Sequence, residues 1–319
     1  MMPVNISRRH FCQSLMGSLM AAGLPMPSVG VAADARQGMT LSISNYGMQS
    51  YPLEDAIRLV AGIGFDGIEL SMMNDWDSTP VKSSAERRQA LRQQFSSAGL
   101  LLTSLMEDLT PSTVDAEHAK SLDRLRRAAE FGRDLSPDRQ PIIQTVLGGG
   151  TWSEKKNLFR DRIGDWQRIA EETKTLLAVK PHRRGAMSLP EQAVWLRSEL
   201  GNSPWLGIVY DYSHFAFRNL PIDQTIKIAG ESTVHIAVKD AVSRGNEVDF
   251  ALPGEAGTID YNEILTGFHR LGYARDVCCE VSSQVFRRSG YDPAVAAKDC
   301  YSRMNQIFES SNVPRRHHS

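Results

Sequence analysis

The stretch LGIVYDYSH, residues 206–214, is an apolar, β-rich run that ends abruptly on the carboxylate of Asp211 and the imidazole of His214. Such a run predicts a buried strand with polar residues just past its carboxyl end. Similar runs recur along the chain, separated by amphipathic stretches with helical spacing. The eight runs are MTLSIS (39–44), FDGIELS (65–71), LLLTSLM (100–106), PIIQTVL (141–147), TLLAVK (175–180), LGIVYD (206–211), TVHIAVK (233–239) and DVCCEV (276–281). Eight strand–helix units in about 280 residues predict an α/β protein with a single (β/α)8 TIM barrel.

An open, doubly wound sheet is the alternative architecture. It would normally carry a glycine-rich phosphate loop after its first strand, and SNYGMQSYP (residues 44–52) is not such a loop. Several of the amphipathic stretches end on glycine, at Gly99, Gly132 and Gly272, where a left-handed residue closes a helix at the lowest cost. These endings fit the alternating strand–helix pattern of a barrel.

The composition is that of an ordinary globular protein, with 319 residues, 41% hydrophobic, 23% charged and a net charge of −1. Without a basic excess, the chain favours a small molecule as its partner over a nucleic acid, whose phosphates require a basic face. After the N-terminal segment only Cys278, Cys279 and Cys300 remain. An odd number of cysteines without C-x-x-C spacing argues against a disulfide framework. The sequence leaves the oligomeric state open, with a homo-oligomer among the options.

The first 35 residues have the order of an export signal. Arg8 and Arg9 precede a mildly apolar run that Pro25 and Pro27 interrupt, and small residues follow in VAADA, residues 31–35. Paired arginines resemble the twin-arginine type of signal, and the run is shorter than the ~20 residues of a membrane span. We therefore expect a cleavable signal in residues 1–35, a barrel in residues 36–311, a disordered tail in residues 312–319, and an exported, periplasmic protein without a membrane partner after cleavage.

In a barrel, alternate side chains of each strand point into the lumen, and the active site forms at the carboxyl ends of the strands. Five strands carry ionisable residues near that end, on the face with the smaller side chains. These residues are Glu69, Lys180 with His182, Asp211, His235 with Lys239, and Glu280. Because an unpaired buried charge is costly, such residues must compensate one another or a bound ion.

Asp211, His235 and Glu280 come from three successive strands and offer two carboxylates and one imidazole. This set suits one divalent metal ion, Mn²⁺, Mg²⁺, Co²⁺ or Zn²⁺, with positions left open for a substrate. His214, just past the strand, would then face the substrate. The alternative is a structural cluster of ion pairs that fills the barrel.

Four motifs in order make the chain resemble the xylose-isomerase-like barrel superfamily. They are DYSH (211–214), HIAVKD (235–240), LPGEAGTIDYNEILTGFHRLGY (252–273) and CCEVS (278–282). That superfamily includes sugar epimerases of the tagatose/psicose type, hydroxypyruvate isomerase, inosose dehydratase and endonuclease IV. The resemblance runs from about Thr40 to Ser310. It implies that Asp211, His235 and Glu280 are metal ligands and that His214 binds substrate or metal.

The chain departs from these relatives at the end of the fifth strand, where they carry a glutamate and this sequence has Lys180. A buried ammonium close to a metal should lose its proton more easily, so we expect Lys180 to act as a base or as a donor to a substrate oxyanion. His182 would supply the missing metal contact. Glu280 would join Lys180 and His214 as a catalytic group. The expected substrate contacts are Glu69, His214, Lys239 and Trp152.

These expectations describe a metal-dependent isomerase or epimerase that acts on a sugar or keto-sugar by proton transfer beside a carbonyl. A lyase or dehydratase of keto-glycosides or keto-inositols is the first alternative, which Lys180 favours. A sugar-binding protein without activity is the second. DNA cleavage like that of endonuclease IV is the weakest reading, because it would require more metal ligands and a basic face.

Overall fold

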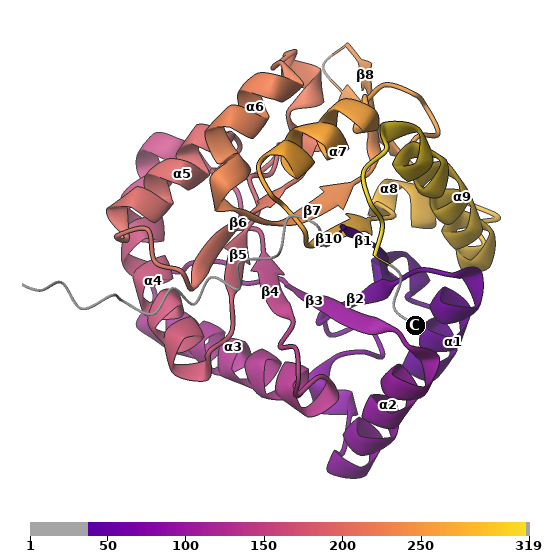
Figure 1. Cartoon of the computed structure of the whole chain (residues 1–319). Coiled ribbons are helices and arrows are strands. Elements are labelled where there is room, and N and C mark those ends of the chain that lie inside the picture. Colours follow the sequence, from indigo (N-terminus) through magenta and orange to yellow (C-terminus); the bar gives the residue numbers. More distant parts are fainter. Residues whose placement is uncertain (1–37, 246, 317–319) are drawn as a thin grey trace, which may run out of the picture. The chain divides into compact units, whose positions relative to one another are not determined.

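A computed structural model describes residues 38–245 and 247–316, and eight parallel strands form a closed barrel in it (Figure 1). The strand order around the barrel is β1-β10-β7-β6-β5-β4-β3-β2. The strands are β1 (Thr40–Ser44), β2 (Gly67–Ser71), β3 (Leu101–Glu107), β4 (Ile142–Thr145), β5 (Leu177–Val179), β6 (Leu206–Tyr210), β7 (Thr233–Val238) and β10 (Asp276–Cys279). Each of the eight predicted runs contributes one barrel strand, so the prediction of a (β/α)8 barrel is confirmed.

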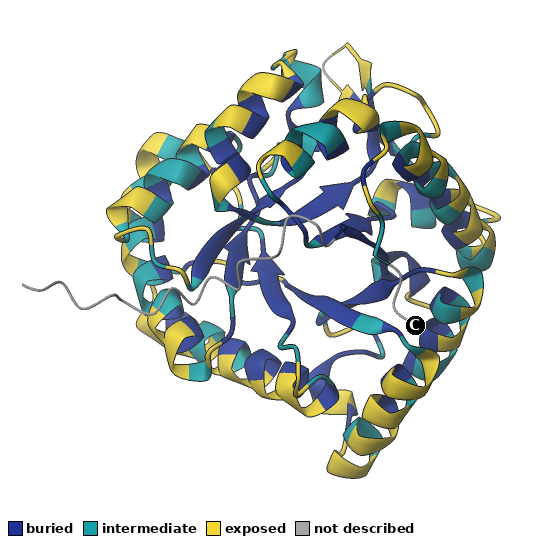
Figure 2. Ribbon diagram, in the orientation of Figure 1, coloured by how far each residue is buried: buried dark blue, intermediate teal, exposed yellow. Residues whose placement is uncertain are grey.

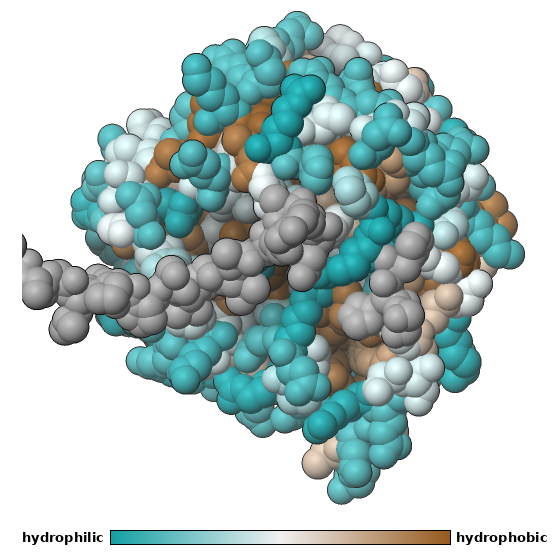
Figure 3. Space-filling view, in the orientation of Figure 1, coloured by the Kyte–Doolittle hydropathy of each residue, from teal (hydrophilic) through white to brown (hydrophobic). Residues whose placement is uncertain are grey.

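Helices surround the barrel and cover the outer face of its strands (Figure 1). They are α1 (Leu53–Ile63), α2 (Ala85–Ala98), α3 (Asp115–Leu135), α4 (Trp152–Thr173), α5 (Pro190–Glu199), α6 (Ile222–Ala229), α7 (Tyr261–Arg270), α8 (Ser283–Phe286) and α9 (Pro293–Ser311). Figure 2 shows buried strands inside helices whose outward faces are exposed. In the space-filling view, hydrophilic side chains lie over the helices, and hydrophobic ones show mainly between them (Figure 3). The main apolar core therefore lies between the strands and the helices.

A hairpin absent from the sequence-based prediction follows β7. Its strands, β8 (Asp240–Arg244) and β9 (Glu247–Ala251), pair antiparallel with Val242 opposite Asp249. The alternation in AVSRGNEVDF, with a Gly-Asn pair between its two halves, is a usual hairpin signal. The carboxylate of Asp240 at the start of β8 accepts hydrogen bonds from three backbone N–H groups of the glycine-containing loop that follows, those of Gly254, Ala256 and Gly257.

Of the segment expected to be a disordered tail, residues 312–319, the structure describes residues 312–316. Backbone groups of Met39 and residues 314–316 are hydrogen-bonded beside the start of β1. The guanidinium of Arg315 also donates to the buried carboxylate of Asp66, with 2.8 Å between Nε and Oδ2. This charge pair could not be read from the tail sequence, because its partner lies far away along the chain. Residues 317–319 lie outside the described part.

The predicted export signal, residues 1–35, lies outside the described residues. In the described part of the chain, none of the helices combines the length and the apolar character that crossing a membrane requires.

The close approach of β6 to β7 gives a first prediction. A Cβ built on Gly207 would lie 2.4 Å from Cγ2 of Val234. Replacing Gly207 with alanine should therefore destabilise the protein by about 1–3 kcal/mol through overpacking, measured by urea unfolding. Gly62, in α1, is the control, since a Cβ there meets nothing within 4 Å. Gly62→Ala should be neutral or stabilising by up to ~1 kcal/mol. Equal effects at both positions would contradict the packing described for Gly207.

Candidate active site

Two lysines and two acids meet at the mouth of the barrel, the end at which the parallel strands reach their carboxyl termini. Lys180, Asp211, Lys239 and Glu280 follow β5, β6, β7 and β10, and together we call them the mouth quartet. The ammonium of Lys239 donates to Oδ2 of Asp211 at 2.5 Å and to Oε1 of Glu280 at 2.8 Å. Lys180 donates to Oε2 of Glu280 at 2.5 Å and lies 3.6 Å from Oδ2 of Asp211. The four groups form one closed network of alternating charge.

All four charges are buried, with exposed fractions of 0% for Asp211, 1% for Lys239, 3% for Lys180 and 9% for Glu280. Burial alone would raise the pKa of the two carboxyl groups, but the lysine charges outweigh it and hold both pKa values well below their ordinary range. Burial would likewise lower the pKa of Lys180, yet Glu280, Asp211 and Glu69 together raise it above its ordinary value. Lys180 therefore stays protonated, contrary to the expectation that it loses its proton easily.

Two neutral histidines lie beside the mouth quartet. The rings of His182 and His214 are 4.1 Å apart between centroids. Burial, reinforced by the charges of Lys239 and Lys180, lowers the pKa of His182 to about 4. Burial also holds the pKa of His214 well below its ordinary value, although Asp211 opposes the shift. Both imidazoles are therefore neutral at pH 7.

The two histidines differ in hydrogen bonding, and the ring of His214 has fewer partners than that of His182. Nε2 of His214 lies 3.4 Å from Oδ2 of Asp211, and neither of its ring nitrogens has a hydrogen-bond partner although the residue is 1% exposed. By contrast, Nδ1 of His182 accepts a hydrogen bond from the backbone N–H of Arg184 at 3.3 Å. Because buried polar groups are normally paired, a buried and unpartnered imidazole is a candidate proton acceptor.

A cavity of about 150 Å³ opens above these groups. Among the described residues, Lys239 and Glu280 of the mouth quartet line it and the other two do not. Further lining residues are Tyr46, His182, Arg183, His214 and Phe250. Phe250 comes from the β8–β9 hairpin, and its ring lies 5.2 Å from Nζ of Lys239 and 5.5 Å from the ring of His214. The hairpin thus supplies an apolar wall to the cavity, which sequence reasoning missed because it placed no strand there.

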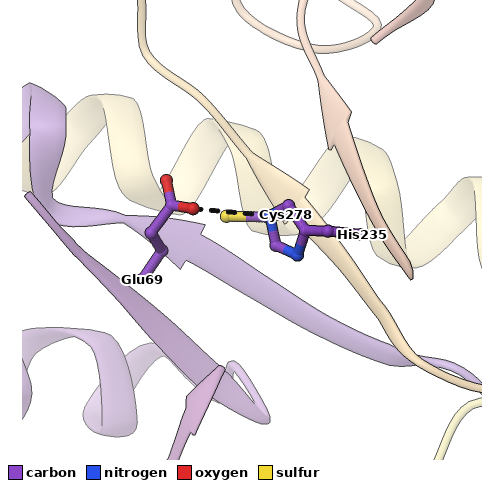
Figure 4. A group of neighbouring side chains, drawn as sticks. All are labelled: Glu69, His235 and Cys278. Atoms are coloured by element: carbon purple, nitrogen blue, oxygen red, sulfur yellow. Dashed lines mark ion pairs between the residues drawn. The ribbon is translucent and has the colours of Figure 1, made fainter. Parts of the chain in front are cut away.

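His235 lies in the lumen with different partners. Its Nε2 is 3.4 Å from Oε2 of Glu69, and the donor atoms of Glu69, His235 and Cys278 all lie within 4.8 Å of one another (Figure 4). We call these three buried residues the lumen group. The same Glu69 oxygen accepts hydrogen bonds from Ser104 at 2.7 Å and from Gln144 at 3.0 Å. Among the described residues, the lumen group is where three side chains of the metal-binding types (Asp, Glu, His and Cys) bring their donor atoms close enough together to hold one metal ion.

Strand register explains why His235 does not join the mouth quartet. Cys278 pairs with Ala237, so Glu280, two residues further on, lies level with Lys239. His235 precedes Lys239 by four residues on the same strand, which is ~13 Å at 3.3 Å per residue. Alternation along β7 correctly puts both side chains on the lumen face, but at different heights.

The divalent ion expected between Asp211, Glu280, His235 and His182 does not fit the mouth as it is built. The ammonium of Lys239 already contacts both carboxylates, and Lys180 contacts them from a second side. A divalent cation held by the same oxygens would stand next to two like charges. His235, the expected nitrogen ligand, contacts Glu69 instead.

Two of the expected substrate residues have protein partners. Trp152, at the start of α4, packs edge-on against Trp195 at 5.3 Å, and it is not among the described residues that line the cavity. Glu69 belongs to the lumen group. Lys239 and His214, in contrast, both line the cavity.

The comparisons with known proteins agree with this architecture. A family model described as xylose isomerase-like TIM barrel matches residues 57–300. None of the curated proteins compared with the chain matches it.

Solved structures share the fold at low identity. The IOLI protein with a bound zinc atom is 18% identical at a TM-score of 0.71, with 86% of this chain and 99% of that one covered. The 3-keto-D-glucoside 4-epimerase of E. coli is 14% identical at a TM-score of 0.63, with 84% and 99% covered. The chain spans 43% of a xylose isomerase-like TIM barrel/4-hydroxyphenylpyruvate dioxygenase fusion protein, which covers 86% of this chain at 18% identity and a TM-score of 0.65. At such identities the likeness shows the fold alone.

The charge network of the mouth quartet yields a stability prediction. Lys239→Met leaves two buried carboxylates with one remaining counter-charge, and it should cost about 3–5 kcal/mol in the free energy of urea unfolding. Adding Asp211→Asn to that variant should cost less than the sum of the two single changes, because the removed charges are partners. The exposed Lys120 in α3 is the control, and Lys120→Met should stay within about 0.5 kcal/mol. Strict additivity would show that the network is not coupled.

Proposed function

Since the chain belongs to the xylose isomerase-like TIM barrel family, we propose that it is an enzyme that isomerises or epimerises a sugar or keto-sugar by proton transfer next to a carbonyl. The carrying observation is the unpartnered, neutral imidazole of His214 beside the ammonium of Lys239 in one cavity. A base and a fixed positive charge side by side are what enolisation requires.

His214 is the proposed proton acceptor. A neutral ring nitrogen with no protein partner is free to take the proton from the carbon beside the substrate carbonyl. The electron pair of that C–H bond then forms the enolate, whose negative charge gathers on the former carbonyl oxygen. Isomerisation follows when the proton returns to the former carbonyl carbon while the proton of the adjacent hydroxyl moves to the former carbonyl oxygen, so that the new carbonyl forms at the adjacent carbon. Returning the proton to the opposite face of the original carbon restores the carbonyl and epimerises the sugar.

Lys239 is the proposed donor to the enolate oxygen. An ammonium has three N–H donors, and Lys239 uses two of them on Asp211 and Glu280. The third remains for a substrate oxygen in the cavity that Lys239 lines. Lys180 holds Glu280 from the far side and acts as a positioning residue. Glu280 is tied through both of its oxygens, so it is a poorer proton acceptor than His214.

Elimination is the second candidate reaction, because a protonated lysine beside the base can also deliver a proton to a departing hydroxyl or glycosyl oxygen. The electron pair of the enolate would then expel that oxygen and leave a carbon–carbon double bond. A binding protein without activity is the remaining alternative.

We also propose export by the twin-arginine route, on the basis of the N-terminal sequence alone.

The test is solvent-deuterium uptake by a panel of keto-sugars and keto-glycosides in D₂O, followed by mass spectrometry. Uptake without loss of a substituent supports isomerisation or epimerisation, and an unsaturated product supports the lyase. Neither outcome with any compound, together with saturable binding of a sugar, would favour the binding protein.

Replacing His214 with glutamine should lower kcat by about 10²–10⁴-fold while KM changes little, because the amide keeps the polar volume but cannot accept the proton as a base. His269→Gln, on α7, is the matched control and should leave kcat unchanged. A fall in kcat/KM that comes only from KM would assign His214 to substrate binding.

The pH profile of kcat/KM should lack a titration near ~6.5, the ordinary histidine pKa. Because burial lowers the pKa values of His182, to about 4, and of His214, the base stays deprotonated through mildly acidic pH. Activity should therefore persist as the pH falls below 6.5 and decline only at a clearly lower pH, because the pKa of His214 lies well below its ordinary value. An acid limb centred near 6.5 would mean that the cavity histidines are solvated in the working enzyme.

A further inference from the structure

The carboxylates of Asp211 and Glu280 already have a cation between them. We propose that the mouth of this barrel works without a divalent metal ion, and that the ammonium of Lys239 occupies the place between the two carboxylates that such an ion would take. The role in catalysis rests on the proposed function, whereas the absence of metal binding at the mouth stands on the geometry alone.

The first argument is the completeness of the network. Both oxygens of Glu280 and one oxygen of Asp211 are bonded to ammonium groups, and the other oxygen of Asp211 accepts from Ser213 at 2.5 Å. Two lysines balance two acids, so the mouth quartet carries no net negative charge. A divalent cation would enter a site with no charge to neutralise.

The second argument is the cost of moving the lysines aside. Lys180 and Lys239 are 3% and 1% exposed. An ion that took over the carboxylates would leave two ammonium groups buried without their partners, and one partner lost from a buried ion pair is strongly destabilising. Binding of the ion would therefore have to overcome both this loss and the direct repulsion between like charges.

The third argument concerns the nitrogen ligand. His235 lies four residues before Lys239 on β7, and Lys239 is level with Glu280, so His235 lies deeper in the lumen, where it contacts Glu69. Any metal that this barrel takes up through His235 would thus lie in the lumen group, apart from the cavity. The two positions can be separated by mutation, because they share no residue.

The deciding experiment is a titration of the chelator-dialysed protein with Mn²⁺, followed by electron paramagnetic resonance and by calorimetry. For the unmodified chain we expect no saturable binding at the mouth up to about 1 mM Mn²⁺. Lys180→Glu turns the mouth quartet into three carboxylates and one ammonium, and it should tighten Mn²⁺ binding at least about tenfold. Lys120→Glu on the surface makes the same change in net charge and should leave Mn²⁺ binding unchanged.

Two further variants assign any binding that the unmodified chain does show. Stoichiometric binding that Asp211→Asn abolishes would overturn the proposal. Binding that Cys278→Ser abolishes and Asp211→Asn leaves intact would place the ion in the lumen group and support a metal-free mouth. If Lys180→Glu fails to fold, Mn²⁺ titrations of the unmodified chain, of Asp211→Asn and of Cys278→Ser still show whether the mouth binds a metal ion.

A parallel measurement separates this inference from the proposed function. Deuterium exchange into a keto-sugar should be unchanged, within about twofold, after exhaustive dialysis against a chelator. If exchange disappears on dialysis and returns with Mn²⁺, and Asp211→Asn abolishes the binding of that Mn²⁺, the metal-free mouth is overturned while the proton-transfer function stays in place. If no compound exchanges at all, the proposed function fails, and the Mn²⁺ titration remains a valid test of the mouth.

Discussion

The hydrogen bonds from one ammonium, that of Lys239, to Asp211 and Glu280 are the interaction on which the mouth of the barrel depends. They join the neighbouring strands β6, β7 and β10, and Lys180 extends the connection to β5. Four buried charges are tolerated there because each has a partner of opposite sign at short range. The same pairing determines the protonation state of the neighbouring groups, since two fixed positive charges, added to burial, favour neutral imidazoles beside them.

A polar lumen has a cost for stability and a benefit for chemistry. Barrel interiors are usually filled by branched apolar residues, whereas here Glu69, His235 and Gln144 occupy buried lumen positions. Hydrogen bonds hold Glu69 and Gln144 in one orientation, whereas the ring nitrogens of His214 and His235 are among the buried polar atoms without a hydrogen-bond partner. Unsatisfied buried groups tend to persist where function requires them. A functional role explains the unpaired nitrogens of His214, which lines the cavity and is the proposed base. The nitrogens of His235 are also unpaired, and its nearest described acidic group is Glu69 of the lumen group.

The fold could be predicted almost completely from the sequence, because it depends on local periodicity that each segment carries by itself. Alternation also identified the side chains of the mouth as lumen-facing. It could not give their height, which depends on how each strand is displaced relative to its neighbours around the closed barrel. For this reason His235 was expected beside Glu280, while Lys239 is the residue level with it. The contact of Arg315 with Asp66 was out of reach for a similar reason, since 249 residues separate the two.

The position of the C-terminal segment beside β1 has a consequence for the connectivity of the chain. The backbone N–H of Arg316 donates to the carbonyl of Met39 at 2.8 Å, so the first and last described segments of the barrel are immediate neighbours. A short peptide linker could therefore fuse them, and new ends could be opened in the exposed turn at Gly245 without cutting a barrel strand. A circularly permuted chain of this kind would keep every strand pairing of the barrel while placing its new ends beside the cavity wall that carries Phe250.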